Sequence, residues 1–95
     1  MEHVILVIYD IRDNKLRFNV SRFLKRVGLT RIQRSAFAGL ARPSDRVNIE
    51  AGLRRITKGW VNFDIQIYVI SSTAYSQRII ISEGYSLEED EEFLI

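Results

Sequence analysis

The stretch Val4–Asp10, with the sequence V-I-L-V-I-Y-D, decides the fold of this 95-residue chain. A short run that is apolar at every position and rich in β-branched residues is typical of a strand covered on both faces. We therefore predict a central sheet strand that ends at Asp10. Ligands and chemistry often lie at such strand ends, although a turn or a helix cap is the simpler role for an isolated Asp.

Length and composition indicate one small domain over residues 1–95. The hydrophobic content is 46% and the chain has no cysteine, which excludes disulfides and thiolate metal sites. No apolar run approaches the roughly 20 residues that span a bilayer. The first residues have no signal-peptide pattern. We expect a cytoplasmic protein without membrane contact.

The charge is distributed unevenly along the chain. All 14 Lys and Arg residues lie at or before Arg78, and 11 of them are Arg, which suits bidentate phosphate contacts. Six of the 12 acidic residues lie in an acidic tail over residues 83–95. A basic body favours a polyanionic partner such as RNA or DNA, although a solvated basic surface is common in other proteins.

Helical spacing and caps predict two helices. The first runs from Asp13 or Asn14 to about Val27, before Gly28. The second follows Pro43-Ser44-Asp45, runs to Lys58 and ends at Gly59, and Gly52 in its middle permits a close packing contact.

Further strands are predicted between and after these helices. The segment Thr30–Leu40 is either one bent strand or two short strands that meet near Arg34-Ser35. Alternation over Phe63–Ile70 gives a strand with one polar face, followed by a polar connection over Ser71–Gln77. A short strand is expected around Ile79–Ile81, and the apolar terminus Phe93–Ile95 is expected to dock as a strand.

This order of elements predicts an α+β, ferredoxin-like sandwich with two helices on one face of an antiparallel sheet. An apolar open sheet face and an apolar terminus favour a homodimer. Within such a dimer, two copies of Asp10 across the twofold axis would hold Mg²⁺ for phosphodiester hydrolysis. Phosphate contacts are expected from a group of nearby residues: Tyr9, Arg12, Arg17, Arg31 and Arg34.

Two blocks of sequence resemble one known family. They are Y-D-I-R-D-N-K-L-R at Tyr9–Arg17 and R-I-Q-R-S-A-F-A-G at Arg31–Gly39. The chain resembles, over most of its length, the small CRISPR-associated adaptation endonucleases, the non-integrase partners of the spacer-acquisition integrase. Two positions depart from the family pattern: Asn19 stands where relatives often have a base, and Arg34 where an aromatic residue is usual.

The resemblance implies a homodimeric Mg²⁺-dependent endonuclease for RNA or DNA, with a C-terminal strand that crosses to the partner and an integrase as a further partner. It implies that Asp10 is the catalytic metal ligand. It also implies that Tyr9, Arg17 and Arg31 lie at the site. For Phe37 a place in the core or at the dimer interface comes first, and stacking on a base second. Two alternatives stay open: a non-catalytic nucleic-acid-binding scaffold of the adaptation complex, and a toxin-like ribonuclease of the same fold.

Overall fold

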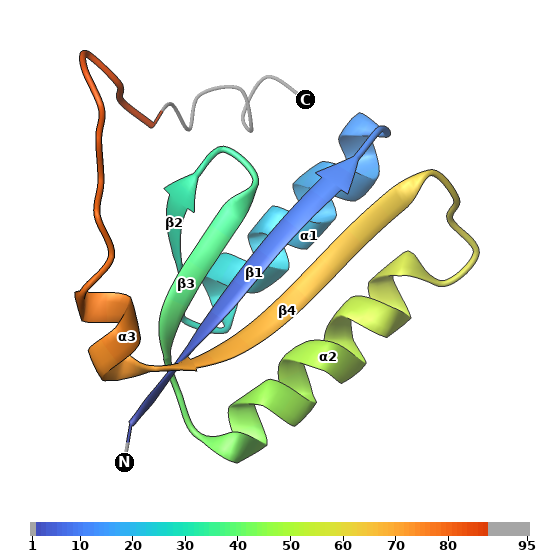
Figure 1. The fold of residues 1–95 in the computed structure, drawn as a ribbon. Helices are drawn as coiled ribbons and strands as arrows, with labels where there is room; N and C mark the ends of the chain where they lie inside the picture. The colour runs from blue at the N-terminus through green and yellow to red at the C-terminus, as the bar shows by residue number, and fades with distance from the viewer. Residues whose placement is uncertain (1, 88–95) are drawn as a thin grey trace.

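A computed structural model describes residues 2–87 of the chain (Figure 1). The elements follow the predicted order, with one short helix added. They are β1 (His3–Ile11), α1 (Asn14–Arg26), β2 (Thr30–Gln33), β3 (Ala36–Ala41), α2 (Pro43–Thr57), β4 (Phe63–Ser71) and α3 (Ser72–Ser76).

The four strands form one sheet in the order β2-β3-β1-β4, and every neighbouring pair is antiparallel. Strand β1 is central and pairs with β4 along its whole length, from His3 opposite Ser71 to Ile11 opposite Phe63. Helix α1 connects β1 to β2, and helix α2 connects β3 to β4. Together with the strand order, these two connections give the predicted ferredoxin-like sandwich. The strand Val4–Asp10 is at its centre because apolar residues occupy both of its faces.

The core lies between one face of the sheet and the helices α1 and α2. Alternate residues of β1 point into it, and the apolar stripe of α1 packs against them. At Gly52, an added Cβ atom would lie 2.2 Å from Cζ of Phe23. The missing side chain therefore lets α2 approach α1 closely, as the sequence suggested. The core residues are Ile5, Val7, Tyr9, Ile11, Leu16, Val20, Phe23, Leu24, Leu29, Phe37, Ile49 and Leu53.

Both long helices begin at side-chain caps. In α1, the carboxylate of Asp13 accepts a hydrogen bond from the N–H of Leu16 at 2.9 Å, and Gly28 beyond its end has φ +97°. In α2, the carboxylate of Asp45 accepts a bond from the N–H of Arg42 at 2.8 Å. This backbone bond is the main cause that lowers the pKa of Asp45 below its ordinary value.

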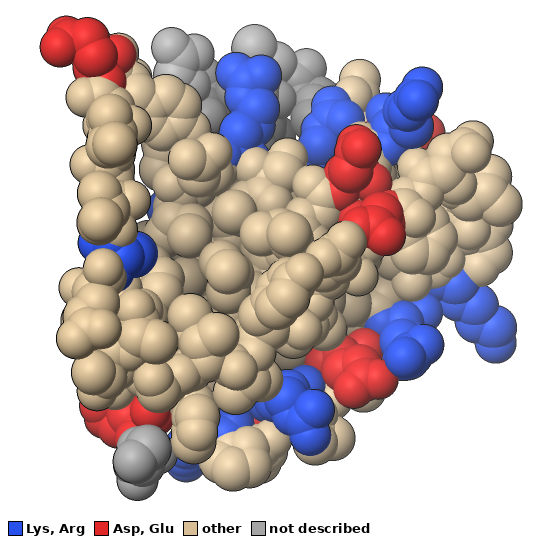
Figure 2. All heavy atoms as spheres, in the orientation of Figure 1, with Lys and Arg blue, Asp and Glu red and all other residues tan. Residues whose placement is uncertain are grey.

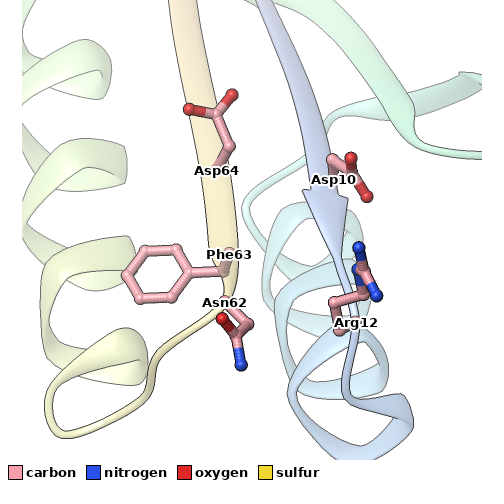
Figure 3. A pocket seen from close by; sticks show the side chains of 5 residues that line it. All are labelled: Asp10, Arg12, Asn62, Phe63 and Asp64. Atoms are coloured by element: carbon pink, nitrogen blue, oxygen red, sulfur yellow. The ribbon is translucent and has the colours of Figure 1, made fainter.

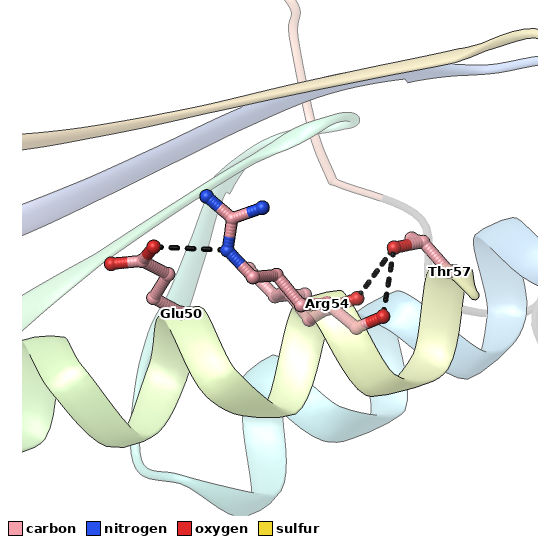
Figure 4. A network of polar contacts seen from close by, with 4 residues as sticks. Glu50, Arg54 and Thr57 are labelled. Atoms are coloured by element: carbon pink, nitrogen blue, oxygen red, sulfur yellow. Dashed lines mark hydrogen bonds and ion pairs between the residues drawn. The ribbon is translucent and has the colours of Figure 1, made fainter.

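The last turns of α2 carry a small polar network (Figure 4). Arg54 forms an ion pair with Glu50 at 3.0 Å, and the buried hydroxyl of Thr57 donates to the carbonyl of Leu53 at 2.8 Å. The Thr57 hydroxyl therefore has a partner within the helix, which offsets the cost of burying it.

The structure decides one open alternative of the sequence analysis and corrects two of its predictions. Residues 30–40 form two strands, because the chain turns at Arg34-Ser35 and the pairing shifts between Arg31 and Gln33. The predicted polar connection after β4 contains helix α3, which Ser71 caps through its side chain. The predicted strand at Ile79–Ile81 is wrong for the single chain, because this segment pairs with no strand of the described residues.

The predicted strand at Phe93–Ile95 lies outside the described residues. Within residues 2–87, no helix is both long enough and apolar enough to cross a membrane.

Candidate functional site

Asp10 lies near the carboxyl end of β1, on the sheet face opposite the helices. Its neighbours along the strand, Tyr9 and Ile11, point into the core, so alternation turns the Asp10 carboxylate toward solvent. Asp10 is directly opposite Asp64 in the β1–β4 register. Residues that face each other across two antiparallel strands share one face of the sheet, and their Cβ atoms are roughly 4.5–5.5 Å apart. The fold therefore places Asp10 and Asp64 side by side on the open sheet face, and Figure 3 shows their carboxylates pointing in different directions.

These two residues line a pocket of about 390 Å³ at the end of the sheet, together with Arg12, Asn62 and Phe63 (Figure 3). The N–H of Arg12 donates to the carbonyl of Asn62 at 3.4 Å, which ties the end of β1 to the start of β4. The Phe63 ring points away from Asp10, toward α2. The exposed side of the pocket is therefore polar, with carboxylates from two strands and one guanidinium.

Asp64 is a site residue that the sequence prediction missed. Its carboxylate accepts a hydrogen bond from the side-chain amide of Gln66 at 3.0 Å, and the hydroxyl of Tyr68 donates to the amide oxygen of Gln66. The three residues alternate along the polar face of β4, a pattern visible in the sequence. What the sequence did not reveal is the register that sets Asp64 opposite Asp10.

The oxygen atoms at this pocket are of the kind that Mg²⁺ prefers. Mg²⁺ is held by one or two carboxylates, and waters and phosphate oxygens complete its shell. Asp10 and Asp64 supply oxygen donors of this kind from one chain. Among residues 2–87, no group of three or more His, Cys, Asp or Glu side chains could hold a metal ion. The donor set fits Mg²⁺ with water and substrate ligands, and it does not fit a cage built of protein alone.

Tyr9 does not line this pocket, and its contact with nucleic acid stays a prediction. The side chain is buried in the core, and its ring stacks on Phe37 with the centroids 6.4 Å apart. The reason is the alternation of the strand, which turns Tyr9 to the helix side when Asp10 faces solvent.

Phe37 and Arg31 are both buried. Phe37 is 0% exposed and belongs to the core, which agrees with the first of the roles considered for it. Arg31 is only 9% exposed, and its guanidinium lies over the Phe37 ring, 4.9 Å from the centroid. It donates to the carbonyl of Arg34 and so holds the β2–β3 turn. This position supports the fold, and contact of Arg31 with phosphate stays a prediction.

Arg17 and Arg34 lie on either side of the end of β1. Arg17 is half-buried and donates to the carbonyl of Ile11 at 2.9 Å and to the side chain of Asn14. Arg34 is exposed on the β2–β3 turn, and the N–H of Tyr9 donates to the carbonyl of the next residue, Ser35, at 3.0 Å. Arg17 therefore supports the start of α1, whereas the role of Arg34 in nucleic-acid binding stays a prediction.

The fold and the strand-end carboxylates define a class: small ferredoxin-like proteins with an acidic site at the end of the central strand. Residues 3–78 match the family model for CRISPR associated protein Cas2. The chain belongs to this family, as the two sequence blocks predicted.

Two curated relatives are described as CRISPR-associated endoribonucleases of this family. The protein from Pyrobaculum aerophilum is 40% identical over 77 residues, which cover 81% of this chain and 84% of the relative. The protein from Korarchaeum cryptofilum is 49% identical over 55 residues, which cover 58% of this chain and 59% of the relative.

Solved structures agree with the fold. A Cas2 crystal structure superposes with a TM-score of 0.71 at 20% identity, and the match covers 93% of this chain and 97% of the other. A chain from a partial Cas6-RT-Cas1–Cas2 complex superposes with a TM-score of 0.68 at 26% identity, and here the match covers 85% and 91%.

Proposed function

We propose that this protein is a divalent-metal-dependent endonuclease that acts in CRISPR adaptation, with RNA as its first candidate substrate and double-stranded DNA as its second. The observation that carries the proposal is the exposed Asp10 carboxylate opposite Asp64 at the end of the central strand. Membership of a family whose curated relatives are described as endoribonucleases supports the same chemistry.

The metal in this proposal is Mg²⁺, held by Asp10 with Asp64 beside it. When bound, Mg²⁺ polarises a phosphoryl oxygen and lowers the pKa of a coordinated water. The chain supplies the rest: Gln66 fixes the Asp64 carboxylate by a 3.0 Å hydrogen bond, and the Arg12–Asn62 backbone bond holds the two strand ends together. The site is thus preorganised on rigid strands, which suits a reaction that depends on exact positioning.

The working form in this proposal is a homodimer. Figure 2 shows Lys and Arg side chains along the edges of the molecule, whereas the broad middle of this face is largely uncharged. Beyond α3, Ile79, Ile80 and Ile81 are 86%, 71% and 94% exposed in the single chain. Such a run of exposed Ile side chains favours burial against another chain. A second copy would bring a second Asp10 to the same face.

A non-catalytic role as a scaffold is the second candidate. Structural similarity to a chain of a partial Cas6-RT-Cas1–Cas2 complex supports it, because a subunit of a complex can act through a binding surface without cleavage. Both candidates include the integrase as a partner. They differ in whether Asp10 performs chemistry.

The test is a cleavage assay with purified protein and labelled single-stranded RNA, single-stranded DNA and duplex DNA, each with Mg²⁺ and with EDTA. We expect Mg²⁺-dependent cleavage by the wild type and background activity for Asp10→Asn, because the amide keeps the shape and removes the charge that holds the metal. Glu50→Gln on α2 is the matched control and should cleave normally. A wild type without metal-dependent cleavage would favour the scaffold.

A further inference from the structure

We infer that Arg12 binds a phosphate oxygen of the nucleic-acid strand that enters the pocket beside Asp10. The inference deepens the proposed function and rests on it for the location of the substrate. Arg12 follows directly after β1, is exposed, and lines the pocket with Asp10 and Asp64. In Figure 3 its guanidinium points back along the strand toward the Asp10 carboxylate.

The backbone of Arg12 is held at two points. On one side it continues β1, whose last residue, Ile11, pairs with Phe63. On the other, its own N–H donates to the carbonyl of Asn62, which has a left-handed φ of +60°. The guanidinium therefore extends from a fixed position at the pocket wall. A fixed starting point reduces the conformational entropy lost when the side chain binds a ligand.

The side chains of Asp10 and Arg12 point toward one another without meeting. Neither makes a hydrogen bond or an ion pair with any residue in the described part of the chain. A group between them must satisfy a carboxylate on one side and a guanidinium on the other. A phosphodiester with a divalent cation would have both features, because Asp10 would hold the cation and Arg12 would donate to a phosphate oxygen.

Two of the other predicted phosphate contacts, Arg17 and Arg31, are already engaged within the fold, and Arg34 does not line this pocket. Arg17 donates to the Ile11 carbonyl, and Arg31 is buried over Phe37. Arg12 is therefore the arginine that the structure leaves available in the pocket. Arginine also suits the task, because its planar fork can donate two parallel bonds to a phosphate and remains charged at every relevant pH.

The test measures binding separately from cleavage. Arg12→Gln and Arg12→Lys are each combined with Asp10→Asn, and the affinity for a labelled oligonucleotide is measured at several salt concentrations. Arg55→Gln in the same background is the control, since it removes one exposed charge on α2 that does not line the pocket. We expect Arg12→Gln to weaken binding about tenfold and to reduce the salt slope by about one, well beyond the control.

Arg12→Lys should keep most of the salt slope while losing part of the affinity, because Lys provides the charge without the fork. Equal affinities and slopes for Arg12→Gln and Arg55→Gln would overturn the inference. Loss of binding in Arg12→Gln, together with a wild type that never cleaves, would keep the inference and reject the nuclease proposal. Melting curves show whether each variant is folded, and the Lys variant decides the question if the Gln variant does not fold.

Discussion

At the scale of single residues, the alternation of side chains along β1 gives neighbouring residues different surroundings. Tyr9 and Asp10 are neighbours in the sequence, yet Tyr9 packs on Phe37 in the core and Asp10 lines the solvent pocket. The period of two along a strand produces this difference. A residue next to a candidate metal ligand in a motif therefore need not touch the substrate, and its importance can lie in holding the strand in place.

The carboxylate that faces Asp10 gives the first prediction. Asp64→Asn should lower the cleavage rate and raise the Mg²⁺ concentration needed for half-maximal activity, because a neutral amide attracts the cation less strongly. The measurement is a Mg²⁺ titration of cleavage. Asp64→Asn should leave the melting temperature nearly unchanged, since Asp64 is exposed. If the variant has the wild-type Mg²⁺ dependence, Asp64 takes no part in the metal site.

At the scale of elements, local caps decide where the helices begin. The Asp45 carboxylate accepts the N–H of Arg42 and lies in the first turn of α2, where a negative charge also interacts well with the helix dipole. The lowered pKa of Asp45 means that folding favours its charged form. The charged Asp45 carboxylate stabilises the folded state at any pH above its pKa in the unfolded chain. This stabilisation is lost as the pH falls through the lower pKa that Asp45 has in the folded state.

The lowered pKa of Asp45 gives the second prediction. Asp45→Ala should melt at a lower temperature than the wild type at neutral pH, because the cap is lost. The gap between the two melting temperatures should narrow as the pH falls below 3.8, the ordinary value for Asp. Thermal denaturation across a pH series measures the gap. A gap that stays constant would mean that the ionised carboxylate contributes nothing to the helix start.

At the scale of the whole molecule, the open sheet face and the segment after α3 are the surfaces without a partner in the described chain. The segment Ile79–Ile81 is strongly apolar, although the single chain gives it neither a strand partner nor much burial. The sequence predicted a strand here, and the single chain forms none over these residues.

The third prediction concerns this segment. Replacing Ile79 and Ile81 with Ser should shift the protein from dimer toward monomer by at least tenfold in dissociation constant, since each buried Ile contributes about 1.5–3 kcal/mol. Sedimentation velocity over a range of concentrations measures the shift. Val61→Ser, which removes an apolar side chain that is 73% exposed between α2 and β4, is the control. A dimer of unchanged strength would exclude the segment from the interface.

The sequence by itself determined the family, the central strand, both long helices with their ends, and Asp10 as the residue at the strand end. These features depend on short-range patterns: an unbroken apolar run, helical spacing, caps and two compact sequence blocks. Such patterns involve residues close together in the chain, so the sequence carries them directly.

Only the tertiary structure decided which side chains meet. The pairing of β1 with β4 sets Asp64 opposite Asp10. The packing of the helices on the sheet buries Phe37 of β3 and Arg31, whose guanidinium lies over the Phe37 ring. These contacts join segments far apart in the chain, and a shift of one residue in strand register would exchange their faces. The physical reason is that register follows from the packing of the whole core, which no local pattern contains.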